Sequence, residues 1–347
     1  MFNFSVICSS SSDRGDKMFG NNNKQPRLSV FQSADTARQF LQQCYKQLHR
    51  EDAVQRSYTN CYPFLYYLEH GQNFYATAQQ APLSIKPVLL FYGMVQLLKA
   101  CLLTVDPDYP ESTSVLAHGV SARKRKKQGY EFLDDEVKVQ KNGLFTHFSE
   151  KMFHVKQEAG EKFRMGALLQ RIGELHDTFF LLSGRKKQLS LPVVHTVSPP
   201  MVAIPKAILD YYHMPLTRFL QYLREEGQGK AITFVNEEGE WLRFQLTAPL
   251  SPVGEGPFFF QLDGTYRIAV KKEKIFLLPE IHAHYLLLYN LSMISRYETE
   301  WWCELLHSYP SKAYIFIVEF LTVSAKKVPW LVNEYLMQKW NSCSADA

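Results

Sequence analysis

Apolar residues along this chain recur with two periods, a helical one toward both ends and an alternating one near the middle. Between Ser33 and His49, for example, apolar side chains return every three or four positions, which predicts a helix with one buried face. Two longer segments, 87–105 and 281–296, are mostly apolar and predict core helices that meet in one buried centre. The predicted helices cover residues 33–49, 58–79, 87–105, 161–182, 216–226, 281–296, 299–307 and 328–340.

Prolines and glycines predict where several of these helices break. Pro63 and Gly71 interrupt the second predicted helix, and we expect Gly71 to be a C-cap because glycine adopts the left-handed conformation found there. Pro329 suits the first turn of the last helix. The apolar run 311–323 is compatible with either a helix or a buried strand. Residues 111–160 are more polar and predict surface loops with short helices.

The pattern changes between residues 189 and 278. Prolines and an alternating Val-Val-His-Thr-Val sequence predict extended chain over 189–204. Asn236-Glu-Glu-Gly239 separates two strand-like runs, and Asp263-Gly264 separates two more, which are hairpin signals. These features predict a small antiparallel sheet.

We therefore predict an α+β fold that is predominantly α-helical, with a helical body built from both ends of the chain and an inserted small antiparallel β segment. The expected organisation is a flexible N-terminal tail over 1–28, a helical part over 29–185, a β-containing segment over 186–278, and C-terminal helices over 279–341 that pack on the helical part.

Residues 87–105 approach the length needed to cross a membrane. Gln96 and Lys99 lie in the middle of this segment, and a lysine at the centre of a bilayer costs about 3 kcal/mol. A core helix with a small polar seam therefore explains the segment better than a membrane span. The six cysteines lie far apart without a CxxC pair, which is typical of reduced cysteines in a cytoplasmic protein. We expect a cytoplasmic location.

Composition excludes disorder for most of the 347 residues, because 46% are hydrophobic and 14% aromatic. The net charge of +5 equals the charge of one basic run, made of Arg123, Lys124, Arg125, Lys126 and Lys127. Neighbouring positive charges attract phosphates, so this run is a candidate contact for RNA, a nucleotide or an acidic partner surface. The alternative is a solvated loop whose charge is balanced by the acidic residues at 134–136.

The sequence contains no GxxxxGK[ST] loop, no GxGxxG after a strand, no GxSxG elbow and no HExxH. These absences argue against several large enzyme classes, and no Cys/His spacing predicts a metal. We therefore expect a binding or regulatory protein without catalytic activity, metal or cofactor, which acts through a protein partner. Arg296, Trp301 and Trp302 are a candidate pocket, the alternative being an ion pair between Arg296 and Glu300 at a helix junction.

Arg171 and His176 support an alternative from a different class. Their Arg-x4-His spacing on a predicted helix is similar to the signature of the HEPN superfamily of helical ribonucleases, whose active site forms at a dimer interface. In that chemistry arginine stabilises phosphate charge and histidine transfers a proton. The resemblance implies an RNA-binding or RNA-cleaving homo-oligomer, although Ile172 replaces the polar residue usual after the arginine.

Four strings together resemble the YaaC family of Bacillus and its relatives over about residues 30–340. They are CYPFLYYLEHG (61–71), PLSIKPVLLFYGMVQLLKACLLTVDPDYP (82–110), LAHGVSARKRKK (116–127) and LSMISRYETEWW (291–302). The family's gene commonly neighbours that of IMP dehydrogenase, so the resemblance implies a link to purine nucleotide metabolism and IMP dehydrogenase as a partner. It transfers no catalytic residues to this chain.

Overall fold

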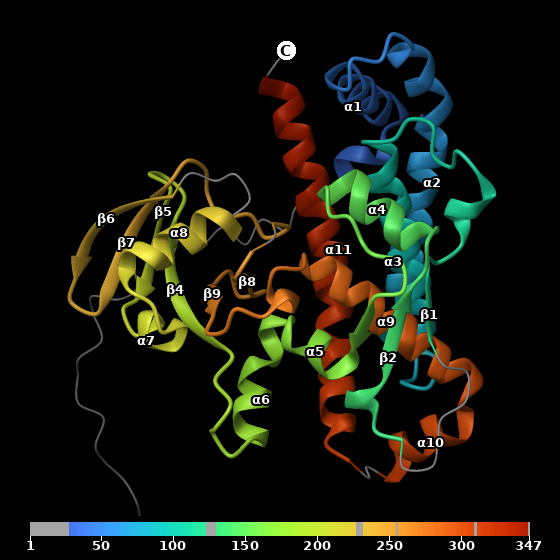
Figure 1. The fold of residues 1–347 in the computed structure, drawn as a ribbon. Coiled ribbons are helices and arrows are strands. Elements are labelled where there is room, and N and C mark those ends of the chain that lie inside the picture. Colours follow the sequence, from blue (N-terminus) through green and yellow to red (C-terminus); the bar gives the residue numbers. More distant parts are fainter. Residues whose placement is uncertain (1–27, 123–129, 227–231, 255, 309–310, 346–347) are drawn as a thin grey trace, which may run out of the picture.

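The computed structural model describes residues 28–122, 130–226, 232–254, 256–308 and 311–345. Helices from both ends of the chain pack together, and strands from the middle form a layer beside them (Figure 1). The α-helices are α1 (Ala34–Gln47), α2 (Ala53–Gln80), α3 (Lys86–Leu103), α4 (Leu144–Phe153), α5 (Met165–Gln170), α6 (His176–Leu182), α7 (Ile208–Tyr212), α8 (Leu216–Glu226), α9 (Glu280–Tyr297), α10 (Thr299–Ser308) and α11 (Ala313–Ala345). Short 3-10 helices are η1 (Leu28–Gln32), η2 (Thr113–Leu116), η3 (Phe132–Asp134), η4 (Gly173–Leu175) and η5 (Lys274–Phe276). The strands are β1 (Val120–Ala122), β2 (Glu136–Val139), β3 (Lys162–Arg164), β4 (Ser190–Thr196), β5 (Met201–Pro205), β6 (Ile232–Glu238), β7 (Trp241–Leu246), β8 (Phe258–Phe260) and β9 (Tyr266–Ala269). The predicted α+β class, mostly helical with an inserted antiparallel β segment, is therefore confirmed.

The six-stranded antiparallel sheet has the strand order β6-β7-β5-β4-β9-β8. Alternate residues of β7, namely Leu242, Phe244 and Leu246, are buried on one face of this sheet. Helices α7 and α8 cover that face with buried side chains such as Phe219 and Leu223, so this region has its own small apolar core (Figure 1). Both predicted hairpins, β6–β7 and β8–β9, are present.

Helix α2 is continuous, so the predicted interruptions at Pro63 and Gly71 are wrong. Pro63 deprives the carbonyl of Thr59 of its helical partner, but both residues are exposed and water can replace the lost bond. Gly71 is buried, and a Cβ atom there would lie 2.7 Å from the Leu97 side chain. This glycine lets α2 approach α3 closely rather than ending the helix.

Helix α11 is also continuous through Pro329, and it takes in the run 311–323 that the sequence left open. Lys327 and Val328 before the proline and Leu331 after it are all buried. Packing on both sides of the proline therefore holds a single helix where local propensity predicts two.

The helix predicted over 161–182 is wrong as a single element. The segment forms β3, α5, η4 and α6 in turn. Strand β3 completes a three-stranded sheet in the order β1-β2-β3, which the sequence analysis missed within its polar loop region. The break lies at Gly173, where a Cβ atom would come within 3.2 Å of Phe259, so the chain turns there to pack against β8.

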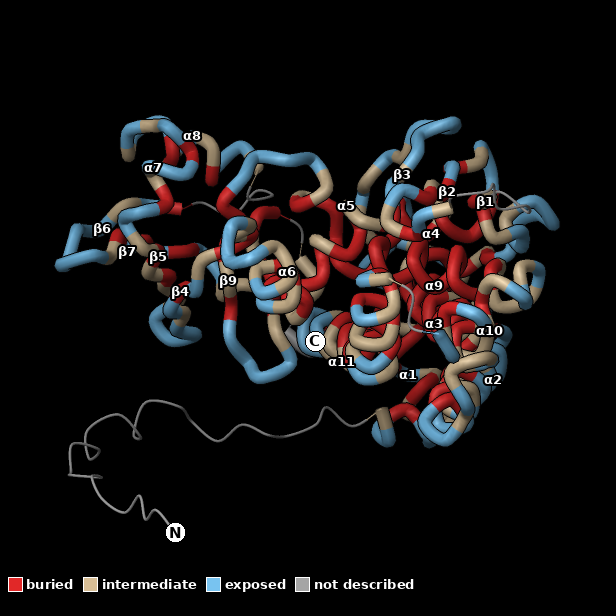
Figure 2. Tube along the Cα trace, turned by 90° about the horizontal axis from the view of Figure 1, so that it is seen from below, coloured by how far each residue is buried: buried red, intermediate tan, exposed pale blue. Residues whose placement is uncertain are grey.

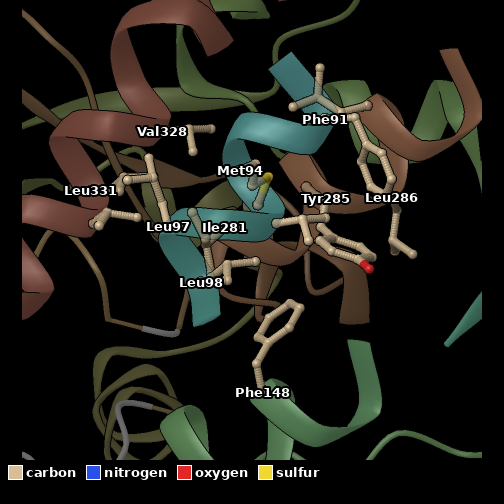
Figure 3. Close-up of a cluster of buried hydrophobic side chains, with 14 of the residues drawn as sticks. Phe91, Met94, Leu97, Leu98, Phe148, Ile281, Tyr285, Leu286, Val328 and Leu331 are labelled. Carbon is tan, nitrogen blue, oxygen red and sulfur yellow. The ribbon is translucent and has the colours of Figure 1, made fainter. Parts of the chain in front are cut away.

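Helices α3 and α9 form the predicted buried centre. Helix α3 packs against α2, α9 and α11, and its side chains meet those of α9, α11 and α4 in one apolar cluster (Figure 3). Both helices run through the buried part of the molecule (Figure 2). Helix α3 is long and apolar enough to cross a membrane, but two-thirds of its length is buried inside the protein, as expected for a core helix.

A buried ionic network joins the β segment to the helical body. Lys327 of α11 is fully buried, and its Nζ atom lies 2.6 Å from Glu174 Oε2 and 2.6 Å from Glu280 Oε1. The same Nζ donates to the Phe260 carbonyl of β8 at 2.6 Å. Burial alone would raise the pKa of Glu280, but Lys327 and its other neighbours outweigh this and lower the pKa to about 2. One lysine therefore ties α9, α11, η4 and β8 together.

Candidate functional site

One side of the core helix α3 remains partly open. Tyr92, Gln96 and Lys99 are half-buried, whereas the residues between them are fully buried. Their spacing of four and three places them on one helical face. This open face is the only part of α3's middle that carries polar side chains, so it is the part of the helix that can contact a polar ligand.

Lys99 lies on this face and has no acidic partner among the described residues. Its Nζ atom lies 5.5 Å from the centre of the Tyr67 ring on α2, within the range of a cation–π contact. Burial lowers the pKa of Lys99. Among the described residues, no carboxylate oxygen lies within 4 Å of its ammonium group.

Arg296 reaches the same face from the end of α9. Its Nε donates to the Ser292 carbonyl at 3.0 Å, and one Nη lies 3.4 Å from the Tyr92 hydroxyl. The guanidinium also lies 5.8 Å from the centre of the Tyr92 ring. These neutral contacts orient the group and leave its charge without a carboxylate within ion-pair distance, as far as the described chain extends.

His118 completes the cluster from the loop before β1. Its ring contacts those of Phe91, Tyr92 and Tyr289 at centre distances of 5.0, 6.0 and 5.8 Å. The Nδ1 atom is buried and has no hydrogen-bond partner among the described residues. Burial lowers the pKa of His118, and the positive charges of Arg296 and Lys99 lower it further.

Lys99, His118 and Arg296, which we call the cationic cluster, therefore place two fixed positive charges beside a neutral imidazole in a half-buried, aromatic setting. Mutual repulsion and incomplete hydration both raise the free energy of this arrangement. A bound anion would reduce both the repulsion and the cost of incomplete hydration. It would also supply a hydrogen-bond acceptor for His118 Nδ1. The arrangement can bind an anion, and phosphate oxygens suit arginine and lysine donors.

The structure places only one member of the predicted Arg296–Trp301–Trp302 group at this cluster. Trp302 is buried, and its Nε1 donates to the Ser84 carbonyl at 3.0 Å. Trp301 packs edge-on against Tyr130 with ring centres 4.9 Å apart. No ion pair forms between Arg296 and Glu300 within the part of the chain that is described. Arg296 instead contacts the Ser292 carbonyl and the rings of Tyr92 and Tyr297.

The basic run Arg123, Lys124, Arg125, Lys126 and Lys127 lies outside the described residues. It stays a predicted anion or partner contact.

Arg171 and His176 are both buried, with exposed fractions of 1% and 3%. Arg171 Nε donates to the Leu278 carbonyl at 2.5 Å. His176 Nε2 lies 2.8 Å from the Gln170 carbonyl, so this nitrogen donates and Nδ1 accepts from the Ser190 hydroxyl at 2.6 Å. Burial lowers the pKa of His176 to about 4. Both side chains support the junction with the β segment, and the RNA-cleavage hypothesis stays a prediction that requires this junction to open.

No group of three or more His, Cys, Asp or Glu side chains among the described residues is placed to hold a metal ion. The cationic cluster itself was not found from the sequence. The sequence predicts that Lys99 lies in a polar seam of a core helix, and His118 belongs to none of its candidate catalytic motifs. A lysine in the middle of an apolar helix was the one available signal, but its partners lie in remote parts of the chain.

Comparison with known proteins identifies a family. A family model described as YaaC-like protein matches residues 29–336, most of the chain, which confirms the resemblance inferred from the four strings. No curated protein and no solved structure matches.

Proposed function

Since this chain belongs to the YaaC-like family, a membership that fixes no activity, we propose its function from the site itself: the protein binds a phosphorylated metabolite at the cationic cluster and acts by binding rather than by catalysis. One observation carries the proposal. Arg296 and His118 both contact Tyr92 on the half-buried face of α3 that also carries Lys99, and no carboxylate within the described residues pairs with Lys99 or Arg296.

A comparison within the same molecule supports this proposal. Lys327 is fully buried, and two carboxylates lie 2.6 Å from its Nζ and compensate its charge. Buried charges in proteins are ordinarily paired in this way. Lys99 and Arg296 are half-buried, and neither has a carboxylate partner among the described residues, so an external anion is the partner we propose for them.

The direct test is calorimetric titration of the full chain with inorganic phosphate and with ribose 5-phosphate. We expect saturable binding that weakens about tenfold or more in Lys99→Met and in Arg296→Met, because each removes one charge-assisted contact. Lys86→Met is the matched control, since it removes the same charge from the half-buried first turn of α3. Absence of binding, or equal affinity in all four proteins, would refute the proposal.

The pH dependence of binding gives an independent readout. The empty cluster favours neutral His118, because burial, Arg296 and Lys99 lower its pKa. A bound anion favours the imidazolium, so binding takes up a proton and strengthens as the pH falls. Sulfate is the suitable probe because its charge is constant between about pH 8 and pH 6. We expect His118→Gln to abolish the dependence.

Regulation through binding requires a protein that responds to the bound form. The partner proposed for the test is IMP dehydrogenase, which the family resemblance suggests. Affinity purification of the chain with and without ribose 5-phosphate, followed by mass spectrometry, should recover a partner whose yield changes with the ligand. An unchanged set of partners would count against regulation while leaving ligand binding intact.

A further inference from the structure

Three aromatic rings form a ladder beside the cationic cluster. His70 and Phe74 on α2 stack with their centres 4.8 Å apart and their planes 13° apart. Phe74 and Tyr92 of α3 follow at 6.3 Å and 28°. The ladder therefore crosses from one helix to the next with nearly parallel ring planes.

Gly93 allows this crossing. A Cβ atom at position 93 would lie 2.9 Å from Phe74 Cβ and 2.8 Å from the Tyr75 ring. Any larger residue would separate α2 from α3 and open the spacing between Phe74 and Tyr92. The close approach of the two helices is thus what makes the ladder continuous.

The ladder is accessible at its outer end and joins the cluster at its inner end. His70 is exposed, and Phe74 and Tyr92 are half-buried. At the other end, the Tyr92 hydroxyl lies 3.4 Å from an Arg296 nitrogen and the Tyr92 ring lies 6.0 Å from that of His118. The same ring therefore belongs to both features.

The distance from Tyr92 to Lys99, the cluster member farthest along α3, fits a small ligand. Tyr92 and Lys99 are seven residues apart on one helix, which corresponds to roughly 10 Å along its axis. A ligand that reaches from the ladder to the ammonium group must therefore carry a flat group and an anionic group separated by a spacer. An aromatic base, a sugar and a phosphate in line meet that description.

We infer that the metabolite bound at the cationic cluster is a free nucleoside phosphate, whose base stacks on the His70–Phe74–Tyr92 ladder while its phosphate contacts Lys99, His118 and Arg296. This inference rests on the proposed function and names its ligand class. Stacking accepts every base because each has a π-face, so the ladder favours nucleotides over sugar phosphates without strong preference among bases.

The test compares a nucleoside 5′-monophosphate with ribose 5-phosphate, which keeps the anion and the sugar and lacks the base. We expect the wild-type chain to bind the nucleotide about tenfold more tightly or better. Phe74→Leu should reduce this preference, because Phe74 is the ring that holds His70 and Tyr92 in one ladder, and should change the affinity for ribose 5-phosphate less. His70→Ala, at an exposed position where folding is not at risk, should reduce the preference severalfold.

Tyr62→Leu is the matched control, because Tyr62 is an exposed α2 aromatic that pairs with Tyr66 outside the ladder. Equal wild-type affinity for the two ligands, or a preference that survives both Phe74→Leu and His70→Ala, would overturn the inference and leave phosphate binding standing. Failure of both ligands to bind would instead remove the proposed function. A short oligoribonucleotide that binds more tightly than the mononucleotide would overturn the assignment to a free ligand.

Discussion

Replacing Lys327 by methionine tests whether the buried network holds the β segment on the helical body. Methionine keeps most of the volume and removes the charge that faces Glu174 and Glu280. Glu280 is only 4% exposed, so the carboxylate left behind has little access to water. The loss should therefore appear in the free energy of unfolding.

The magnitude follows from two independent arguments. In the native protein the surroundings of Glu280, with Lys327 the largest favourable contributor, lower its pKa from 4.5 to about 2, a difference that corresponds to about 3 kcal/mol. Removal of one partner from a buried ion pair costs roughly 3–5 kcal/mol in general. We expect Lys327→Met to lose about 3 kcal/mol at pH 7.5.

The loss should also depend on pH, with a sign that can be worked out. Wild-type stabilisation from Glu280 is fully present above pH 4.5 and disappears as the pH falls toward about 2. In Lys327→Met the carboxylate keeps only Arg171 at 3.9 Å and His284 at 3.4 Å, so its pKa is higher than in the wild type and the variant loses less stability on acidification. The difference between wild type and variant should therefore shrink as the pH falls from 4.5 to about 3.

Urea unfolding followed by circular dichroism measures these differences. Lys326→Met is the control, because Lys326 is the exposed neighbour on the same helix. The double variant Lys327→Met/Glu280→Gln should recover part of the lost free energy of unfolding, because it removes the buried carboxylate that Lys327 no longer compensates. A loss below about 1 kcal/mol, or one equal at about pH 7.5 and about pH 3, would refute the reasoning.

Three further outcomes follow from single side chains. Gly71→Ala should destabilise the protein by roughly 1–2 kcal/mol despite its better helix propensity, because the new methyl group would meet Leu97 at 2.7 Å; unfolding midpoints measure this, and a stabilised variant would contradict the packing argument. Arg171→Ala and His176→Ala should lower the thermal midpoint by several degrees, and RNA cleavage assayed beside them decides the nuclease hypothesis, which needs an activity that both variants lose. Lys99→Met should raise the thermal midpoint of the ligand-free protein by a few degrees while it weakens phosphate binding; a lowered midpoint would indicate a structural lysine.

The elements predicted correctly are those in which local pattern and tertiary packing agree. Helix α8 has the predicted limits, Leu216–Glu226, because its apolar stripe faces the sheet and no proline or glycine disturbs it. Helices α3 and α9 are predicted from long apolar runs that are buried on most sides, and the hairpins are predicted from their turn residues. In α8 the residues that recur as apolar in the sequence are buried or half-buried in the structure.

The errors lie where a contact with a remote part of the chain outweighs a local signal. Pro63 and Pro329 are helix breakers by propensity, yet packing before and after each of them maintains α2 and α11. The predicted helix over 161–182 breaks at Gly173, which the apolar periodicity does not indicate. The neighbour of Gly173 is Phe259, 86 residues farther along the chain. No local rule contains that contact.

The cationic cluster could not be predicted from the sequence for a further reason. Its interpretation depends on the absence of a carboxylate near Lys99 among the described residues, and that absence is visible only in the structure. From the sequence, a lysine on a core helix is explained equally well by a buried salt bridge, by a side chain whose ammonium group reaches the solvent, or by a ligand-binding site. Lys327 shows the first case in this protein, with two carboxylates at 2.6 Å. Lys99 differs because the aromatic ring of Tyr67, and no carboxylate of the described chain, is its neighbour. A leucine or methionine would satisfy the fold at that position at lower cost, and the proposed anion binding gives a reason for a lysine there that stability does not supply.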